Sequence, residues 1–219
     1  MAVNLSEFMD WVVARNPALM SSFDTAQFSV AATYIAPDVG VSGESAPVYS
    51  SASALMDDSV APEALIPAIY YVTPLNEKVS LGLGLFSNFG LATEFSEDYA
   101  AGQLAGISEI TTINFNTSVS YKVDDHWTVA LGLNYIYADA NLVRHFGDNP
   151  LGLPPQTVAS SLEGDDSGYG WDLGLAYEMH EGSRFGLHYR SKTKLSFEGE
   201  YFNQLPVALG GLAGTVLDG

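Results

Sequence analysis

Long segments of this chain alternate apolar residues with small or polar residues at every second position. In the clearest segment, residues 127–138 with the sequence WTVALGLNYIYA, the odd positions are Trp, Val, Leu, Leu, Tyr and Tyr. The even positions are Thr, Ala, Gly, Asn, Ile and Ala. Side chains of a β-strand point alternately to its two faces, so this period predicts a strand with one apolar face. That face must pack either into a protein core or against lipid.

The same alternation recurs along the chain and predicts an antiparallel sheet of about seven strands. The connections between them alternate in length. The sequences PLNEK, DDH and EGS are tight polar turns, whereas residues 91–108, 145–168 and those from 203 onward are long and either acidic or rich in Gly and Pro. The predicted strands are residues 26–35, 64–73, 78–90, 111–122, 126–144, 169–180 and 183–200.

The face opposite the apolar one favours a membrane barrel over a soluble sandwich. It carries Gly, Ala, Asn, Ser and scattered charge, whereas the outward face of a soluble sheet is plainly hydrophilic. Charged residues make up only 16% of the chain, against a usual quarter. Aromatic residues lie near strand ends, among them Trp127, Tyr137, Trp171 and Tyr177. Such residues suit the girdles of an outer-membrane barrel.

The predicted fold is therefore all-β, an antiparallel transmembrane β-barrel of the outer-membrane type. Its apolar face would contact lipid and its small polar face would line a lumen. A soluble β-sandwich or lipocalin-like barrel is the alternative. No window approaches the ~18 uninterrupted apolar residues of a membrane helix.

The N-terminal segment follows a different period. Leu5, Phe8, Met9, Val12 and Val13 fall at helical spacing, which predicts a short amphipathic helix over 4–14 that ends before the Asn-Pro pair at 16–17. The first residues, MAVNLSEFMDWVV, lack the basic region and apolar core of a secretion signal. We therefore expect either a protein that stays inside the cell or a chain that is not the whole precursor.

Composition excludes several classes of function. The 26 acidic and eight basic residues give a net charge of −18, which leaves no basic surface for nucleic acid. The absence of cysteine excludes disulfides, thiolate metal sites and cysteine nucleophiles. The four histidines show no metal-binding spacing, and no G-x-S-x-G elbow is present. We expect no catalytic residue, no metal and no cofactor, so an enzyme is the least favoured class.

Two features could carry a binding function. Arg144 lies among Leu142, Val143 and Phe146, where a guanidinium can pair with a carboxylate in an apolar pocket. From these residues alone, an arginine at the membrane interface or a salt bridge to Asp139 or Asp148 is favoured. The sequence SNFG at 87–90 interrupts an alternating strand, which indicates a bulge or kink unless the strand simply ends there.

Five segments of the sequence resemble the FadL-type outer-membrane transporters of long-chain fatty acids and other hydrophobic molecules. They are RNPAL at 15–19, FSVAATYIAPDVGVSG at 28–43, SNFGLATEFSEDYAAG at 87–102, and the longer stretches 111–148 and 168–201. The resemblance implies a fourteen-stranded barrel plugged by an N-terminal hatch. Substrate is captured at extracellular loops, moves to a buried pocket and leaves sideways at a kink in the third strand.

The resemblance also implies roles for particular residues. It places Asn16, Pro17 and Ala18 in the hatch near the kink, Asn88 and Gly90 in the gate at the kink, and Arg144 in the pocket facing the head group of the ligand. The ligand-binding set implied in this way is Ser87, Phe89, Arg144 and Phe146. Residues 1–24 would be a shortened hatch and residues 25–219 the N-terminal part of the barrel, incomplete because the chain ends about halfway along the family pattern.

The predicted function is passive, porin-like uptake of long-chain fatty acids or similar hydrophobic compounds across the outer membrane of a Gram-negative cell. Its partners would be the hydrophobic molecule, outer-membrane lipid and lipopolysaccharide. One alternative is a structural or adhesive outer-membrane protein whose acidic loops bind divalent ions or lipopolysaccharide. Another is a soluble lipid-binding β protein.

Overall fold

In the computed structural model, the described residues, 10–44, 55–180, 183–212 and 214–218, form ten strands in one antiparallel sheet. The order of neighbouring strands is β1-β2-β3-β5-β6-β7-β9-β10, with β4 also on β5 and β8 also on β7. The strands are β1 (Gln27–Ile35), β2 (Ala64–Pro74), β3 (Val79–Phe86), β4 (Gly90–Thr93), β5 (Gly106–Lys122), β6 (Trp127–His145), β7 (Val158–His180), β8 (Ser183–Arg190), β9 (Glu198–Phe202) and β10 (Val216–Asp218). The prediction of an all-β antiparallel fold is confirmed.

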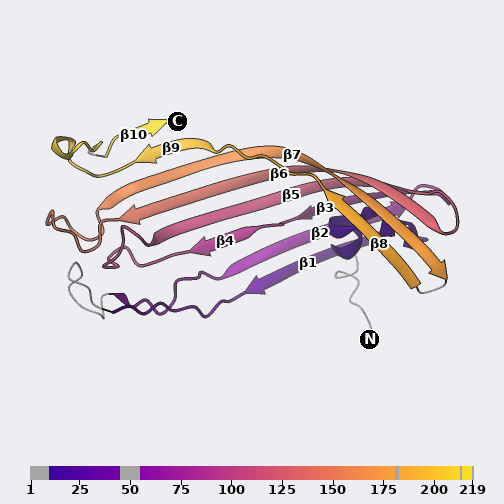
Figure 1. Cartoon of the computed structure of the whole chain (residues 1–219), viewed down its shortest axis with the longest axis horizontal. Coiled ribbons are helices and arrows are strands. Elements are labelled where there is room, and N and C mark those ends of the chain that lie inside the picture. The colour runs from indigo at the N-terminus through magenta and orange to yellow at the C-terminus, as the bar shows by residue number, and fades with distance from the viewer. Residues whose placement is uncertain (1–9, 45–54, 181–182, 213, 219) are drawn as a thin grey trace.

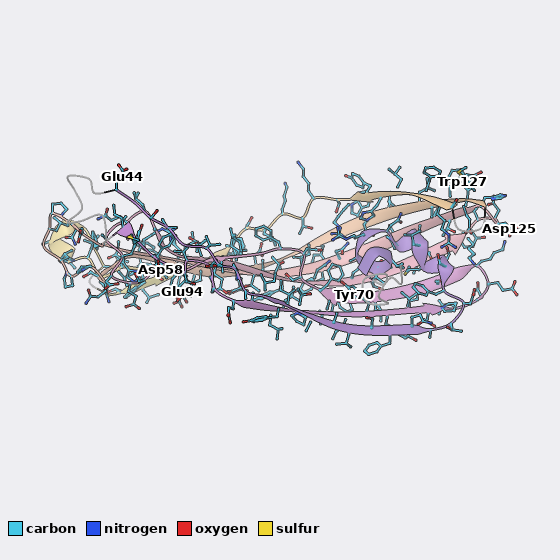
Figure 2. All side chains as sticks on the ribbon, turned by 90° about the horizontal axis from the view of Figure 1, so that it is seen from below. Glu44, Asp58, Tyr70, Glu94, Asp125 and Trp127 are labelled. Carbon is cyan, nitrogen blue, oxygen red and sulfur yellow. The ribbon has the colours of Figure 1, made fainter. Side chains whose placement is uncertain are left out.

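The sheet curls around the N-terminal segment. Figure 1 shows β5, β6 and β7 running side by side along the molecule. Seen from below in Figure 2, the short N-terminal coils lie in the hollow of the curled sheet at the broad end, which carries Asp125 and Trp127. Glu44, Asp58 and Glu94 lie at the narrow opposite end. Short turns and long connections thus sit at opposite ends, as the alternating lengths predict.

The two faces of β6 differ as the alternation predicts. Val129, Leu131 and Leu133 are 41%, 52% and 57% exposed, whereas Thr128 and Asn134, which flank this stretch on the alternate positions, are buried. The apolar face therefore points away from the hollow, and the small polar face points into it. A bare apolar face of this length has no protein core to contact, so it is the lipid-facing wall of a barrel.

Aromatic pairs mark the two edges of this apolar band. Near the turns the rings of Trp127 and Tyr177 lie 4.5 Å apart, and farther along the strands those of Tyr135 and Tyr169 lie 5.3 Å apart. The last aromatic residue on this face of β6 is Tyr137, two residues beyond Tyr135. From residue 127 to residue 137 the strand advances about 33 Å, which a tilt of about 40° reduces to about 25 Å across a membrane. The band therefore has the height expected of an outer-membrane barrel.

Two strands begin earlier than the sequence predicts. β5 starts at Gly106 instead of residue 111, and β7 at Val158 instead of residue 169. The predicted loop 145–168 is therefore wrong over its last eleven residues. Beyond the lipid band the outer face of the wall meets water, so it carries Glu163 and Asp165 on a regular strand. The charged residues in 158–168 resemble a loop in sequence, but they belong to the part of β7 that extends beyond the membrane into water.

The segment predicted as one strand over 183–200 is broken in the middle. β8 ends at Arg190 and β9 begins at Glu198, and both pair with β7. At the break the hydroxyl of Ser191 accepts a hydrogen bond of 2.8 Å from the Trp171 N–H and so satisfies a donor at the end of the β7–β8 ladder. The preceding turn, EGS, falls outside the described residues apart from Ser183.

The predicted hatch is described from residue 10 onward, so residues 4–9 of the predicted helix lie outside the described part. Its two coils are η1 (Asp10–Arg15), a π-helical turn in place of the predicted α-helix, and η2 (Pro17–Ser22), a 3-10 helix; a third short helix, η4 (Val207–Leu209), follows β9. Val12, Val13 and Met20 pack with Tyr70, Val72 and Phe86 of the sheet in the largest core cluster. Among the described helices, none combines the length and the apolar character that a membrane span requires.

The β5–β6 turn provides a pH-dependent prediction. Asp124 Oδ1 accepts hydrogen bonds of 2.8 Å from the backbone N–H groups of His126 and Trp127, which lower the pKa of this carboxyl below its ordinary value. A lowered pKa means that the turn is stabilised above the pKa of the unfolded chain, about 3.9. We expect this stabilisation to disappear as the pH falls through the folded-state pKa. The amide shifts of His126 and Trp127 in a pH titration check it, and Asp124→Asn should not show the transition.

Candidate functional site

Arg144 lies near the end of β6, on the inner face. Its guanidinium donates hydrogen bonds of 2.7 Å and 2.8 Å to the carbonyls of Ile107 and Val143, and one of 2.9 Å to the Ser108 hydroxyl. Asp139 lies at an odd position of β6 and faces the opposite side of the sheet. The contacts recorded for Arg144 are thus with neutral acceptors, and the positive charge is held in place without a carboxylate partner among them.

Apolar loop residues lie beyond this end of the strands. Leu55, Tyr99, Ala100 and Ala101 form a buried cluster against which Phe95 packs. The Tyr99 hydroxyl donates a 3.2 Å hydrogen bond to the Leu55 carbonyl. The Asp148 N–H donates a hydrogen bond of 2.8 Å to the Ala100 carbonyl, so the cluster lies against the connection that follows Arg144 and β6.

Phe146 follows Arg144 by two residues and is held through its backbone. Its N–H donates to the Thr157 carbonyl at 2.9 Å, and its carbonyl accepts from Gln103 Nε2 at 2.5 Å. Gln103 Nε2 also donates to the Asp148 carbonyl at 2.9 Å. One side chain thus joins the β4–β5 connection to the β6–β7 connection. Sequence reasoning did not identify Gln103, because nothing in its surroundings distinguishes it from a solvated glutamine.

The sequence SNFG forms the kink that its composition predicts. β3 pairs with β5 as far as Phe86 with Asn114, and pairing resumes in β4 with Gly90 opposite Thr111. The chain advances four residues from Phe86 to Gly90, whereas β5 advances only three between their partners, Asn114 and Thr111. The extra residue makes a β-bulge. The Thr112 hydroxyl fills the gap, since it donates to the Phe89 carbonyl at 2.6 Å and lies 3.2 Å from the Phe89 N–H. Ser87 also donates to that carbonyl, at 3.1 Å.

Asn16 fixes the hatch to the wall. Its Oδ1 accepts from the Ala18 N–H at 3.1 Å, and its Nδ2 donates to the carbonyls of Leu175 and Leu187 at 3.2 Å and 3.5 Å. Glycines at 174 and 186 permit this approach, because a Cβ atom at Gly174 would collide with Asn16 Oδ1 and one at Gly186 would lie 2.8 Å from Nδ2. Asn16 thus contacts β7 and β8 and has no recorded hydrogen bond to the kink.

Pro17 and Ala18 are buried beneath the same stretch of wall. Pro17 starts η2, where its missing N–H costs no hydrogen bond. Ala18 packs against Ala130 and Ala176, one small residue each from β6 and β7. Small residues on both sides allow the backbone of the hatch to lie close to the sheet.

The structure does not gather the predicted binding residues into one contact site. Arg144 pairs with Gly106 of β5, whereas the kink is level with Thr111 to Asn114 of the same strand. That separation of five to eight residues corresponds to about 16–26 Å along the strand. Arg144 and Phe146 therefore lie at one level of the sheet and Ser87 to Gly90 at another.

A buried polar network joins the inner faces of β5, β6 and β7. Asp172 Oδ2 accepts hydrogen bonds of 2.6 Å and 3.3 Å from the side-chain amides of Asn134 and Asn116, and all three side chains are at most 3% exposed. Asn134 in turn accepts 2.9 Å from Asn114. Within the described ranges, no group of three or more His, Asp or Glu residues could hold a metal ion. The hydrogen bonds of the network link the three strands through their side chains.

Comparison with known families gives one match over almost the whole chain. Residues 9–219 match the model of the family described as "Outer membrane protein transport protein (OMPP1/FadL/TodX)". The long-chain fatty acid transport protein of Salmonella typhi is 38% identical over 211 residues, which are 90% of this chain and 48% of that protein. Outer membrane protein P1 of Haemophilus influenzae is 32% identical over 222 residues, 85% of this chain and 48% of that protein. The chain thus spans about half the length of these relatives.

Solved structures agree on the fold. A FadL homologue from Pseudomonas aeruginosa superposes with a TM-score of 0.64 at 16% identity, covering 96% of this chain and 54% of the other. The toluene transporter TodX of P. putida superposes with a TM-score of 0.65 at 19% identity, covering 96% and 56%. The curled sheet around an N-terminal coil is therefore the arrangement found in these barrels.

Proposed function

The chain belongs to the OMPP1/FadL/TodX family of outer membrane transport proteins, and from this premise we propose that it takes up long-chain fatty acids or similar hydrophobic compounds. Its location is the outer membrane, and the relatives named above are transport and membrane proteins rather than enzymes. The observation that carries the proposal is Arg144, a cation on the inner face whose recorded partners are all neutral.

Binding would divide the ligand between two environments. The half-buried side chains of Phe95 and Phe146 offer surface for a hydrocarbon tail, at roughly 0.8 kcal/mol for each buried CH₂ group. Arg144 would orient the carboxylate, because a guanidinium binds a carboxylate with two parallel, charge-assisted hydrogen bonds. The backbone carbonyls that now hold Arg144 are weaker acceptors, so a carboxylate would compete well for its donors.

Exit would take place at the kink. Ser87 to Gly90 interrupt the ladder between β3, β4 and β5, so the Thr112 side chain, bonded to the carbonyl and the N–H of Phe89, joins the wall there in place of continuous backbone pairing. The hatch, fixed by Asn16, lies inside the same wall. Lateral passage at the kink would need only these few contacts to change, and the hatch residues Asn16, Pro17 and Ala18 would gate it.

Arg144→Ala tests the head-group role. Removal of a hydrogen bond to a charged group costs about 1.5–3 kcal/mol, so binding of palmitate should weaken roughly 10- to 150-fold. Binding of hexadecane, which has no head group, should change by less than about threefold. The measurement is ligand titration of the chain folded in detergent, with far-UV circular dichroism as the check on folding.

Arg144→Lys is the matched control, because it keeps the charge but loses the planar fork. It should recover part of the palmitate affinity. Equal losses for palmitate and hexadecane in Arg144→Ala would remove the head-group role of Arg144. A folded parent chain that binds neither ligand would count against transport binding by this part of the barrel.

A further inference from the structure

A cavity lies between the hatch and β8. It has a volume of about 560 Å³ and is lined by Ala14, Arg15, Asn16, Leu19, Gly186, His188 and Arg190. Cavities of roughly 300–1,000 Å³ are the size that small-molecule ligands occupy. Two arginines line it, although the chain has only eight Lys and Arg residues against 26 acidic ones. Cationic groups on an otherwise acidic chain are thus gathered at a cavity away from Arg144.

Arg190 connects three parts of the molecule across this cavity. It is the last residue of β8, and its Nη2 donates a hydrogen bond to the backbone carbonyl of Ala14 in the hatch. Its Nη1 donates to Asn88 Oδ1, in the kink, at 3.4 Å. The hatch and the kink, which Asn16 does not join, are therefore joined by one guanidinium.

The bond to Asn88 is the weaker part of this connection. Hydrogen bonds between N–H and O typically measure 2.7–3.2 Å, so a contact of 3.4 Å is near the limit. Both acceptors are neutral amide oxygens. A carboxylate offers a negative charge and two oxygens spaced to match the guanidinium fork, and such bonds are about twice as strong as neutral ones. A carboxylate in the cavity would therefore take the donors that now hold Asn88.

Within the part of the chain that the structure describes, no carboxylate occupies this position. Asp172, which lies opposite Arg190 in the β7–β8 pairing, is held by Asn134 and Asn116 and lies 3.6 Å from His188. Glu178, the other acidic residue that pairs with β8, forms an ion pair of 3.1 Å with Arg184. The contacts recorded for Arg190 are those with Asn88 and Ala14.

We infer that Arg190 is a latch that senses the head group: the carboxylate of a long-chain ligand entering the cavity binds Arg190 and releases Asn88, and with it the kink, from the hatch. The inference rests on the proposed function, and it adds a second carboxylate-binding point downstream of Arg144. Uncharged hydrocarbons would pass the cavity without opening the latch. Arg190 would thus be a ligand-binding residue that distinguishes acids from hydrocarbons at the exit.

Hydrogen–deuterium exchange on the whole chain in detergent tests the latch. Without ligand, Arg190→Gln should speed exchange in peptides covering 86–90 and 12–16 by roughly five- to tenfold, because the bonds to Asn88 and Ala14 are lost. Arg190→Lys, which keeps one charged donor group, should fall between. Arg184→Gln is the matched control: it lies on the same face of β8 and bonds Ser22 and Glu178, so it should leave the kink peptides unchanged.

Ligand addition tests the sensing step. Palmitate should speed exchange of the kink peptides in the parent chain several-fold and have no further effect in Arg190→Gln, whereas 1-hexadecanol should have none in either. Equal responses to palmitate and hexadecanol would overturn the carboxylate-sensing role. Unchanged kink exchange in ligand-free Arg190→Gln would overturn the latch itself. Failure of the parent to bind palmitate would instead contradict the proposed function, and the ligand-free comparison would still decide whether Arg190 joins hatch and kink.

Discussion

Leu133→Arg is expected to destabilise the folded chain in a bilayer by about 2–4 kcal/mol, the cost of an arginine at the lipid midplane of a barrel. Leu133 is 57% exposed on the outer face of β6 and lies between the aromatic residues Trp127 and Tyr137. An arginine there has to leave water for hydrocarbon. Urea unfolding of the chain folded into lipid vesicles measures the loss.

Asp139→Arg is the control on the same strand and face. Asp139 lies two residues beyond Tyr137, outside the apolar band, so the cost should fall to about 0–1 kcal/mol. A similar loss of stability at both positions would mean that Leu133 does not lie deeper in the lipid than Asp139. No loss at Leu133 would contradict the orientation of the sheet.

The orientation of the wall could be predicted from sequence because it depends on neighbouring residues alone. Side chains of a strand alternate between faces, so Leu131 and Gly132 must point to opposite sides wherever the strand runs. The kink could be predicted for a similar reason, since Asn88 and Gly90 disturb a local pattern. In both cases a few neighbouring residues determine the structure, namely the face to which each side chain points and the position of the kink.

The contacts that hold the hatch could not be predicted in this way. Asn16 bonds Leu175 and Leu187, which are 159 and 171 residues away, and Arg190 bonds Ala14 across 176 residues. No local pattern marks an arginine at the end of a strand as the partner of a helix carbonyl. The resemblance to a family implies a role for Asn16 but does not identify its partners. Thr112, which bonds Phe89 in the kink, cannot be distinguished in sequence from other polar residues on the inner face.

Asn16→Ala is expected to free the hatch from the wall while the barrel strands stay folded. The change removes the acceptor that caps Ala18 and the donors to Leu175 and Leu187. At about 1 kcal/mol for each lost hydrogen bond, the free energy of opening the hatch should fall by about 2–3 kcal/mol. Exchange of the amides in 12–20 should then speed up roughly 30- to 150-fold, measured by native-state hydrogen exchange with the amides of β6 as the internal reference.

Asn16→Asp separates the two kinds of contact that Asn16 makes. An aspartate keeps the acceptor for the Ala18 N–H, but it loses the donors and places a negative charge against two carbonyl oxygens. If the bonds to the wall hold the hatch, Asn16→Asp should open it at least as much as Asn16→Ala. If capping alone matters, Asn16→Asp should resemble the parent chain, and the hatch would be held by Val12, Val13 and Met20 in the core. The first result would make Asn16 a polar attachment of the hatch to β7 and β8, beside the bonds of Ser21 to Thr128, Ser22 to Arg184 and Ala14 to Arg190. Of these partners only Arg190 also bonds the kink.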